Sequence, residues 1–349
     1  MVRIALDAMG GDHAPEVPVS GAVEAARELG VGIVLVGNTG VVERELAKHD
    51  ASGLDITIRH ASQVVEMEES ASVVLRKKKD SSIRVATTMV KSGEAVAVVS
   101  AGHSGATMAT AFFVLGTVKG VERPAIGAFM PTVNGVSLIV DAGANVDCKP
   151  MHLMQFAIMG DVFARQVWGL GKPNIGLLSI GEEDTKGNEL TREAFKLLKE
   201  SRLNFIGNIE GRDVFNGRAD IIVCDGFIGN VAIKISEGLV EAMNSLLKKE
   251  IEEAIGGQLG YLLLRPAFKK FKKKLDYAEF GGAPLLGING ISMICHGHST
   301  PKAIKNGIKL ARDFHSKHVN RHIQADIERM LADSSPAMDL VNSGEGVLQ

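Results

Sequence analysis

A histidine and a serine stand between two glycines directly after an apolar run, and their types suit the binding of a small anion. In the segment AVAVVSAGHSGATMATAFFVL, which begins at Ala95, Gly102 and Gly105 bracket His103 and Ser104. The valine-rich run before this turn is typical of a strand buried on both faces. The run after it is rich in alanine, methionine and leucine and predicts a helix. The segment therefore predicts a strand, a glycine turn and a helix.

This order of elements places unpaired helix N–H groups at the carboxyl edge of a parallel sheet, where an anion can bind. We expect Ser104 to cap the helix, with Ser104 and Gly105 at the anion and the His103 side chain over it. The alternative is a purely structural role, in which Ser104 only caps the helix and the glycines only turn the chain.

The N-terminal segment VRIALDAMGGDHAP repeats this organisation. A buried strand is predicted to end at Asp7, Gly10 and Gly11 allow a turn, and Pro15 can open the next helix. Asp7 and Asp12 are candidates for an acid, a hydrogen-bond acceptor or a metal ligand, with the two glycines in the binding turn. The alternative is that Asp12 caps the helix and Asp7 orders the loop.

Three further polar loops follow strand-like runs. DAGAN extends from Asp141 to Asn145, GEEDTKGNEL contains Lys186, and DGFIGN contains Asn230 before a helix predicted from about Val231. A parallel sheet collects the loops after its strands on one edge. Five such loops therefore predict one site built from several of them.

Lys186 lies among acidic residues, and two roles are open for it. It can neutralise Glu182, Glu183 and Asp184 in its own loop. If the loop folds over the same edge of the sheet as His103, its ammonium is instead a fixed positive charge beside an anionic substrate.

Composition and patterning limit the class of protein. The chain has 349 residues, of which 45% are hydrophobic and 23% charged, with a formal net charge of -2. Strand and helix signals alternate without a linker, which predicts one α/β domain over residues 1–349. The charge argues against nucleic acid as a partner. The turn Asn134-Gly135 predicts that the runs 124–130 and 136–140 pair as strands.

The three cysteines are widely separated and form no CxxC pair, which fits a reducing cytoplasm and excludes a thiolate zinc site. His296 and His298 in CHGHS lack a carboxylate at ligand spacing, so a hydrogen-bonding role in a loop is favoured over metal binding. The N-terminus does not have the pattern of a signal sequence, and no apolar run reaches the roughly 18 residues of a spanning helix. We expect a cytoplasmic protein without a metal, and attachment to a membrane surface stays open.

A second informative stretch is GQLGYLLLRPAFKKFKKKLD, residues 257–276. Phe268, Phe271 and Leu275 recur at helical spacing, so a helix here carries an apolar stripe flanked by lysines. Three interpretations are open: docking of an acidic partner protein, adhesion to anionic lipid, or a solvated helix whose stripe packs at a dimer contact. The basic residues are Arg265, Lys269, Lys270, Lys272, Lys273 and Lys274.

The loop motifs DAMGGDHAP, SAGHSGAT, DAGAN, GEEDTKGNEL and DGFIGN, in this order, resemble those of the bacterial phosphate acyltransferases that use acyl carrier protein. The likeness continues through EFGGAPLLGINGISMICHGHS and covers nearly the whole chain, although residues after about 332 match no pattern.

The resemblance implies a three-layer α/β/α sandwich with a mostly parallel, Rossmann-like sheet, related to phosphotransacetylases and isopropylmalate dehydrogenases. It includes a helical excursion at about residues 231–280 and implies a homodimer. The implied reaction is reversible transfer of a fatty acyl group from acyl carrier protein to inorganic phosphate. The acyl phosphate would feed a membrane glycerol-3-phosphate acyltransferase in phospholipid synthesis.

Loop placement and resemblance together give the residue roles. Phosphate is itself the nucleophile in this reaction, so neither a serine or cysteine nucleophile nor a cofactor is required. Lys186 and His103 are expected at the reacting phosphate or carbonyl, with Asn230 orienting it. Substrate-binding positions are expected at Asp7, Gly10, Gly11, Asp12, Ser104, Gly105, Asp141 and Asn145.

Three other functions compete with this interpretation. A phosphotransacetylase would use acyl-coenzyme A in place of the carrier protein. A nicotinamide-dependent dehydrogenase on the related fold would need a dinucleotide motif, and the complete G-x-G-x-x-G pattern does not occur in the sequence. A membrane-surface scaffold would have no need of five polar loops.

Overall fold

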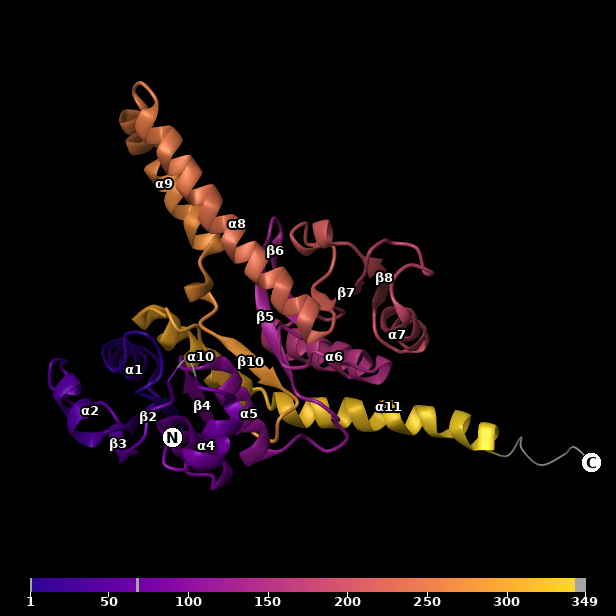
Figure 1. Ribbon diagram of the computed structural model, residues 1–349, viewed down its shortest axis with the longest axis horizontal. Coiled ribbons are helices and arrows are strands. Elements are labelled where there is room, and N and C mark those ends of the chain that lie inside the picture. Colours follow the sequence, from indigo (N-terminus) through magenta and orange to yellow (C-terminus); the bar gives the residue numbers. More distant parts are fainter. Residues whose placement is uncertain (1, 67–68, 343–349) are drawn as a thin grey trace, which may run out of the picture.

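A computed structural model describes residues 2–66 and 69–342 of the chain (Figure 1). Its strands are β1 (Arg3–Asp7), β2 (Gly32–Gly37), β3 (Ile56–His60), β4 (Ala97–Ser100), β5 (Ala125–Thr132), β6 (Gly135–Val140), β7 (Ile175–Leu178), β8 (Phe205–Ile209), β9 (Ile221–Val223), β10 (Ala283–Leu286) and β11 (Ser292–Ile294). Within these residues they form one 11-stranded sheet in the order β3-β2-β1-β4-β11-β10-β5-β6-β9-β7-β8.

The main helices are α1 (Glu16–Leu29), α2 (Thr39–Leu46), α3 (Ala71–Lys77), α4 (Ser82–Lys91), α5 (Ser104–Leu115), α6 (Pro150–Phe163), α7 (Glu189–Glu200), α8 (Gly226–Glu253), α9 (Gly257–Leu275), α10 (Pro301–Ser316) and α11 (Val319–Asn342). Short helical segments cover Ala164–Trp168, Gly211–Val214 and Tyr277–Glu279.

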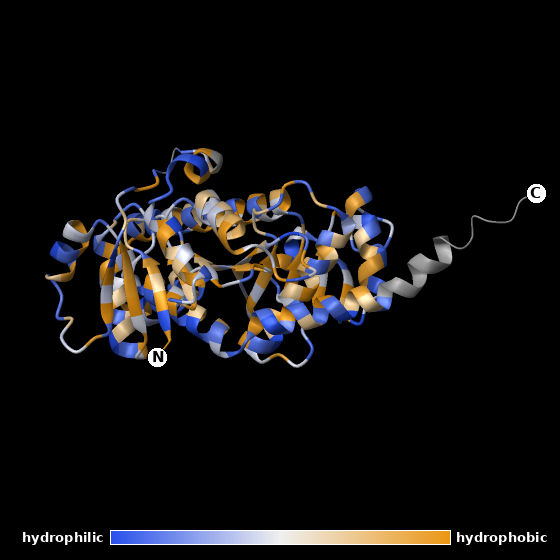
Figure 2. Ribbon diagram, turned by 90° about the horizontal axis from the view of Figure 1, so that it is seen from below, coloured by the Kyte–Doolittle hydropathy of each residue, from blue (hydrophilic) through white to orange (hydrophobic). Residues whose placement is uncertain are grey.

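Strand β1 shows how the layers arise. Ile4 and Leu6 are buried in one apolar core, which they share with residues of α1 and α10, whereas Ala5 lies in another core with residues of α4. Successive side chains of a strand point to opposite faces, so one strand contributes to both cores. Helices therefore cover both faces of the apolar strands (Figure 2), and the predicted three-layer α/β/α sandwich is confirmed.

The sheet reverses direction near its centre. β10 is antiparallel to both β11 and β5, and β5 is antiparallel to β6. The other pairings are parallel, as predicted for most of the sheet. β5 and β6 join at the predicted Asn134-Gly135 turn. As a result, β1, β4 and β11 run opposite to β6, β7 and β9.

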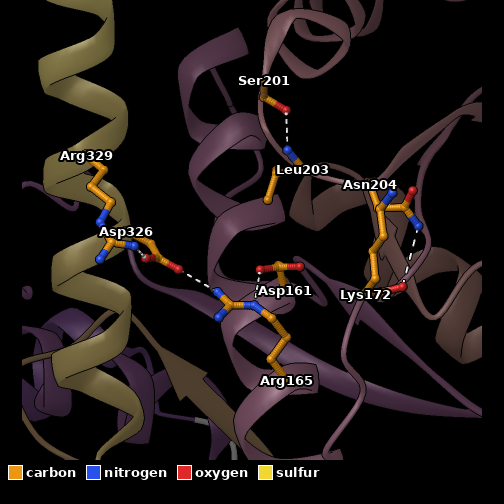
Figure 3. Close-up of polar contacts among 8 residues, drawn as sticks. All are labelled: Asp161, Arg165, Lys172, Ser201, Leu203, Asn204, Asp326 and Arg329. Carbon is orange, nitrogen blue, oxygen red and sulfur yellow. Dashed lines mark hydrogen bonds and ion pairs between the residues drawn. The ribbon is translucent and has the colours of Figure 1, made fainter.

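Polar contacts tie helix α11 to the second half of the sheet. Arg165, just beyond α6, donates from Nε to Asp161 over 2.6 Å and also bonds Asp326 of α11 (Figure 3). Burial raises the pKa of the Asp161 carboxyl, against the lowering effect of Arg165. Figure 3 also shows the Ser201 hydroxyl accepting the N–H of Leu203, which closes the turn after α7.

Helices α8 and α9 form a hairpin that projects away from the α/β body (Figure 1). The hairpin begins at Gly226 and not at about Val231, because Asp225 caps α8 by accepting the N–H of Ile228. No residue of α9 is buried, and Phe271 is 47% exposed. No helix in the described part of the chain is long and apolar enough to cross a membrane.

Candidate active site

Three turns at the carboxyl ends of β1, β4 and β11 are in contact with one another. A Cβ on Gly10 would lie 2.8 Å from the amide nitrogen of Gly102, and one on Gly11 would lie 3.2 Å from the carbonyl oxygen of Gly297. The N–H of Asp12 donates to that carbonyl over 3.0 Å. The glycines are therefore needed because the three backbones pack closely. We call this cluster of turns, residues 7–13, 100–103 and 295–299, the glycine-turn site.

Asp7 lies buried at the base of the glycine-turn site. Its carboxylate accepts the hydroxyl of Ser100 over 2.8 Å and the N–H of Met9 over 3.2 Å. Burial raises the pKa of Asp7, partly offset by hydrogen bonds from Ser82 and Ser100. Because these bonds join the turns after β1 and β4, the expected loop-ordering role of Asp7 fits its geometry best.

His103, and not Ser104, caps helix α5. The N–H of Ala106 donates to Nδ1 of His103 over 3.0 Å, and Ser104 is the first residue of the helix. The prediction that Ser104 is the cap is therefore wrong by one position. Since Nδ1 accepts a hydrogen bond, the neutral imidazole carries its proton on Nε2 and can donate it.

His103 lines a hollow beside Asp7, Gly10 and Gly102 with about 220 Å³ of empty space, open solvent included. The predicted residues Asp7, Gly10 and His103 therefore lie together, and Ser104 and Gly105 follow at the start of α5. The other residues that line the hollow are Met9, Val65, Ser82, Ile83, Ala106 and Thr107.

A second cluster forms where the DAGAN loop after β6 meets the start of α8. Asp141 is fully buried, and its carboxylate accepts N–H groups from Ile126 and Asn145, the latter over 2.7 Å. Burial raises the pKa of Asp141, against the lowering effect of these hydrogen bonds. Asn145 donates its amide to Asp141 and to the carbonyl of Pro124. Both predicted side chains are therefore used to hold the loop itself.

Asn230 belongs to the first turns of α8 and not to a glycine turn before it. Asn230 is exposed. It lies beside the DAGAN loop, because a Cβ on Gly143 would be 3.5 Å from the Cβ of Asn230. Gly229 packs on the carbonyl of Asp141 so closely that an added Cβ would be 1.9 Å from its oxygen. Of the predicted residues of this cluster, Asn230 is therefore the exposed one.

Lys186 is exposed, and two of its three acidic neighbours, Glu182 and Asp184, are paired with other cations. Glu182 pairs with Arg212 and Arg218 over 3.1 and 3.0 Å, and Asp184 pairs with Lys199 over 2.7 Å. Among the described residues, no carboxylate lies within ion-pair distance of the Lys186 ammonium. Lys186 therefore does not neutralise a carboxylate of its own loop through an ion pair.

The prediction that all five loops lie on one edge of a parallel sheet is wrong. The two antiparallel pairings of β10 cancel, so β5 runs in the same direction as β11. The antiparallel β5–β6 hairpin then makes the carboxyl ends of β1 and β4 point opposite to those of β6, β7 and β9. The loops therefore fall into two sets: the glycine-turn site, and the DAGAN, DGFIGN and Lys186 loops. The Asn134-Gly135 turn already carries the signal for this reversal, whereas the place of β10 between β11 and β5 depends on contacts between distant segments and has no local signal.

Sequence reasoning missed Ser82, Ser100 and the pairing of His298 with Asp12. Nδ1 of His298 lies 2.6 Å from Oδ2 of Asp12. The expected hydrogen-bonding role of the CHGHS loop is thus observed, whereas Asp12 does not cap α1, which begins after Pro15. In residues 2–66 and 69–342 no group of three or more His, Cys, Asp or Glu side chains could hold a metal ion.

Comparison with known proteins identifies the family of the chain. Residues 2–322 match the model of a family described as "Fatty acid synthesis protein". The chain is 61% identical over 319 residues to the phosphate acyltransferase of Geobacter sp. strain M21, covering 91% of each chain. This chain belongs to the phosphate acyltransferase family. The phosphate acyltransferase of Geobacter sulfurreducens is 59% identical over 327 residues, with 94% of each chain covered.

Solved structures support the fold of this phosphate acyltransferase family member. A phosphotransacetylase from Streptococcus pyogenes superposes with a TM-score of 0.59 at 18% identity, covering 90% of this chain and 94% of that one. The EutD phosphotransacetylase from Staphylococcus aureus gives a TM-score of 0.57 at 19% identity, covering 89% and 94%. The chain is therefore an acyltransferase that transfers acyl groups to phosphate, on a fold shared with phosphotransacetylases.

Proposed function

We propose that the acyl donor is a fatty acyl group on acyl carrier protein, and that the acyl phosphate product serves phospholipid synthesis. The observation that carries this proposal is the basic face of α9. Its lysines and Arg265 are exposed on a hairpin that projects from the body, where a protein can reach them. A carrier protein is acidic, so such a face would attract it and increase its rate of association.

The chemistry requires an anion to approach a thioester carbonyl. A phosphate oxygen forms a bond to the carbonyl carbon, the C–S bond breaks, and the sulfur leaves with the electron pair and takes up a proton. Gly10 and Gly11 in the turn after β1, and Ser104 and Gly105 in the first turn of α5, supply backbone N–H groups that suit phosphate. His103 donates from Nε2 to the phosphate or to the carbonyl oxygen.

Lys186 and Asn230 belong to the other set of loops, and the proposal requires these loops to reach the thioester carbonyl beside the glycine-turn site. The uncommitted ammonium of Lys186 offsets the repulsion that an anionic nucleophile meets. The exposed amide of Asn230 orients the reacting group, and Asp141 and Asn145 keep the loop beneath it in place.

The same basic helix suits two further partners. Its exposed aromatic and leucine side chains, Phe271 among them, could enter the surface of an anionic membrane, to which an amphiphilic product must be delivered. The product would there meet a glycerol-3-phosphate acyltransferase of the membrane. The apolar stripe also suits a second copy of the chain in a homodimer, and the enzyme would work at the cytoplasmic face.

One assay separates the two donors. The protein is incubated with palmitoyl-acyl carrier protein, with and without inorganic phosphate, and acyl phosphate is trapped as the hydroxamate. Phosphate-dependent hydroxamate with equal release of free carrier supports the proposal. Product from palmitoyl-coenzyme A but none from the carrier would overturn it in favour of a coenzyme A-dependent phosphotransacetylase.

A further inference from the structure

The CHGHS loop after β11 carries a histidine–aspartate pair on the edge of the glycine-turn site. Nδ1 of His298 lies 2.6 Å from Oδ2 of Asp12, and the backbone of Asp12 is bonded to Gly297 over 3.0 Å. The two residues are therefore fixed to one another through side chain and backbone. Asp12 is two positions along the same turn from Gly10, which lines the hollow.

This pairing determines which nitrogen of His298 can accept a proton. A carboxylate only accepts hydrogen bonds, so Nδ1 of His298 carries a hydrogen. In the neutral ring the lone pair is then on Nε2, and a proton added there is stabilised by the Asp12 carboxylate. The neighbouring His296 supports the ring, with centroids 5.5 Å apart, and its Nδ1 accepts the N–H of His298 over 3.3 Å.

His103 has the opposite arrangement. Its Nδ1 accepts the N–H of Ala106, so the neutral ring has a proton on Nε2 and no nitrogen left to receive another. Asp7 is buried and already accepts the Ser100 hydroxyl and the N–H of Met9. Of these three groups of the glycine-turn site, His298 is the one whose Nδ1 is held as a donor by a carboxylate, that of Asp12.

The reaction has a proton to move. Monohydrogen phosphate loses its hydrogen when it becomes the phosphate of a dianionic acyl phosphate, and the departing sulfur gains one as a thiol. We propose that Nε2 of His298 takes this proton from phosphate and returns it to the sulfur, with Asp12 as the positioning residue. The proton balance closes without another acid or base. This inference rests on the proposed function only in that phosphate attacks a thioester.

The test compares His298→Gln, His298→Ala and Asp12→Asn with wild type in the hydroxamate assay, using whichever donor wild type accepts. His298→Gln should lower kcat by about 100-fold, with KM for phosphate nearly unchanged, since proton transfer is lost and not binding. Free imidazole should restore part of the rate to His298→Ala but none to Asp12→Asn, which keeps its imidazole. His322→Gln, an exposed histidine on α11, is the matched control and should keep wild-type turnover.

The His298 side chain is 74% exposed, so its variants should fold, and their thermal unfolding midpoints check this. A His298→Gln enzyme that is folded and keeps more than about a third of wild-type kcat would overturn the proposal. So would a loss of activity in His298→Ala that imidazole leaves unchanged. If wild type makes no acyl phosphate from either donor, the proposed function itself is refuted. Failure of the His298 proposal and failure of the proposed function are therefore distinguishable.

Discussion

The N–H of Ala106 donates to Nδ1 of His103 over 3.0 Å, so one imidazole both caps helix α5 and presents its other nitrogen as a donor beside the glycine turns. The same side chain thus has a structural and a chemical task. Substitutions can separate them, because asparagine is a good helix cap that lacks the imidazole Nε2–H.

His103→Asn and His103→Ala should both lose turnover, by about tenfold or more, because the donor to phosphate or carbonyl is removed from each. Only the alanine variant should also lose stability, by about 1 kcal/mol, since it leaves the N–H of Ala106 without its cap. Initial rates and urea unfolding measure the two effects. If the asparagine variant kept normal turnover, His103 would be only a cap.

Lys186→Ala should lower turnover by about tenfold or more while the fold stays intact, because the uncommitted ammonium of this loop is lost. Lys199→Ala is the matched control, since Lys199 is likewise exposed but is paired with Asp184 over 2.7 Å. Rates at saturating phosphate and circular dichroism make the comparison. Near-normal rates for Lys186→Ala would remove Lys186 from the mechanism.

Asp7→Asn should change how stability depends on pH. Burial raises the pKa of Asp7 above 3.8, so between that value and the raised pKa the folded protein binds more protons than the unfolded chain. Stability from this group is therefore present below about pH 4 and is lost as pH rises through the raised pKa.

Because asparagine does not titrate, the free energy of unfolding of Asp7→Asn minus that of wild type should increase as the pH rises from about 4 through the raised pKa of Asp7. Asp141, whose pKa is also raised by burial, is present in both proteins and cancels in this difference. Urea unfolding across the range provides the values. A difference that stays constant with pH would show that Asp7 does not titrate as the geometry indicates.

Charge reversal of Lys269 and Lys273 on α9 should raise KM for the carrier protein or reduce binding to anionic vesicles, because both partners are attracted by positive charge. A double reversal of Lys91 and Lys172 on the α/β body changes the net charge equally and should do neither. Both variants are measured at low salt, where screening is weak. If the α9 variant matched the control, the basic face of α9 would have no such partner.

Much of the fold could be predicted because its signals are local. The order of strand, glycine turn and helix at Gly10 and at Gly102 follows from residue patterns over a few positions, and the Asn134-Gly135 turn specifies its own hairpin. The sequence pattern predicts the cap of α5 one residue late, at Ser104. Serine is the commoner cap, and the bond to Nδ1 of His103 depends on a side-chain rotamer that no sequence pattern expresses.

The sequence by itself determined the family, the α/β layers and the candidate residues His103, Lys186 and Asn230, since periodicity and motifs are carried by neighbouring positions. Only the tertiary structure decided which loops meet. The pairing of β10 with β5 joins the two halves of the sheet, and the approach of β11 to β4 brings His298 to Asp12. Such contacts join segments hundreds of residues apart, and their geometry follows from packing of the whole sheet.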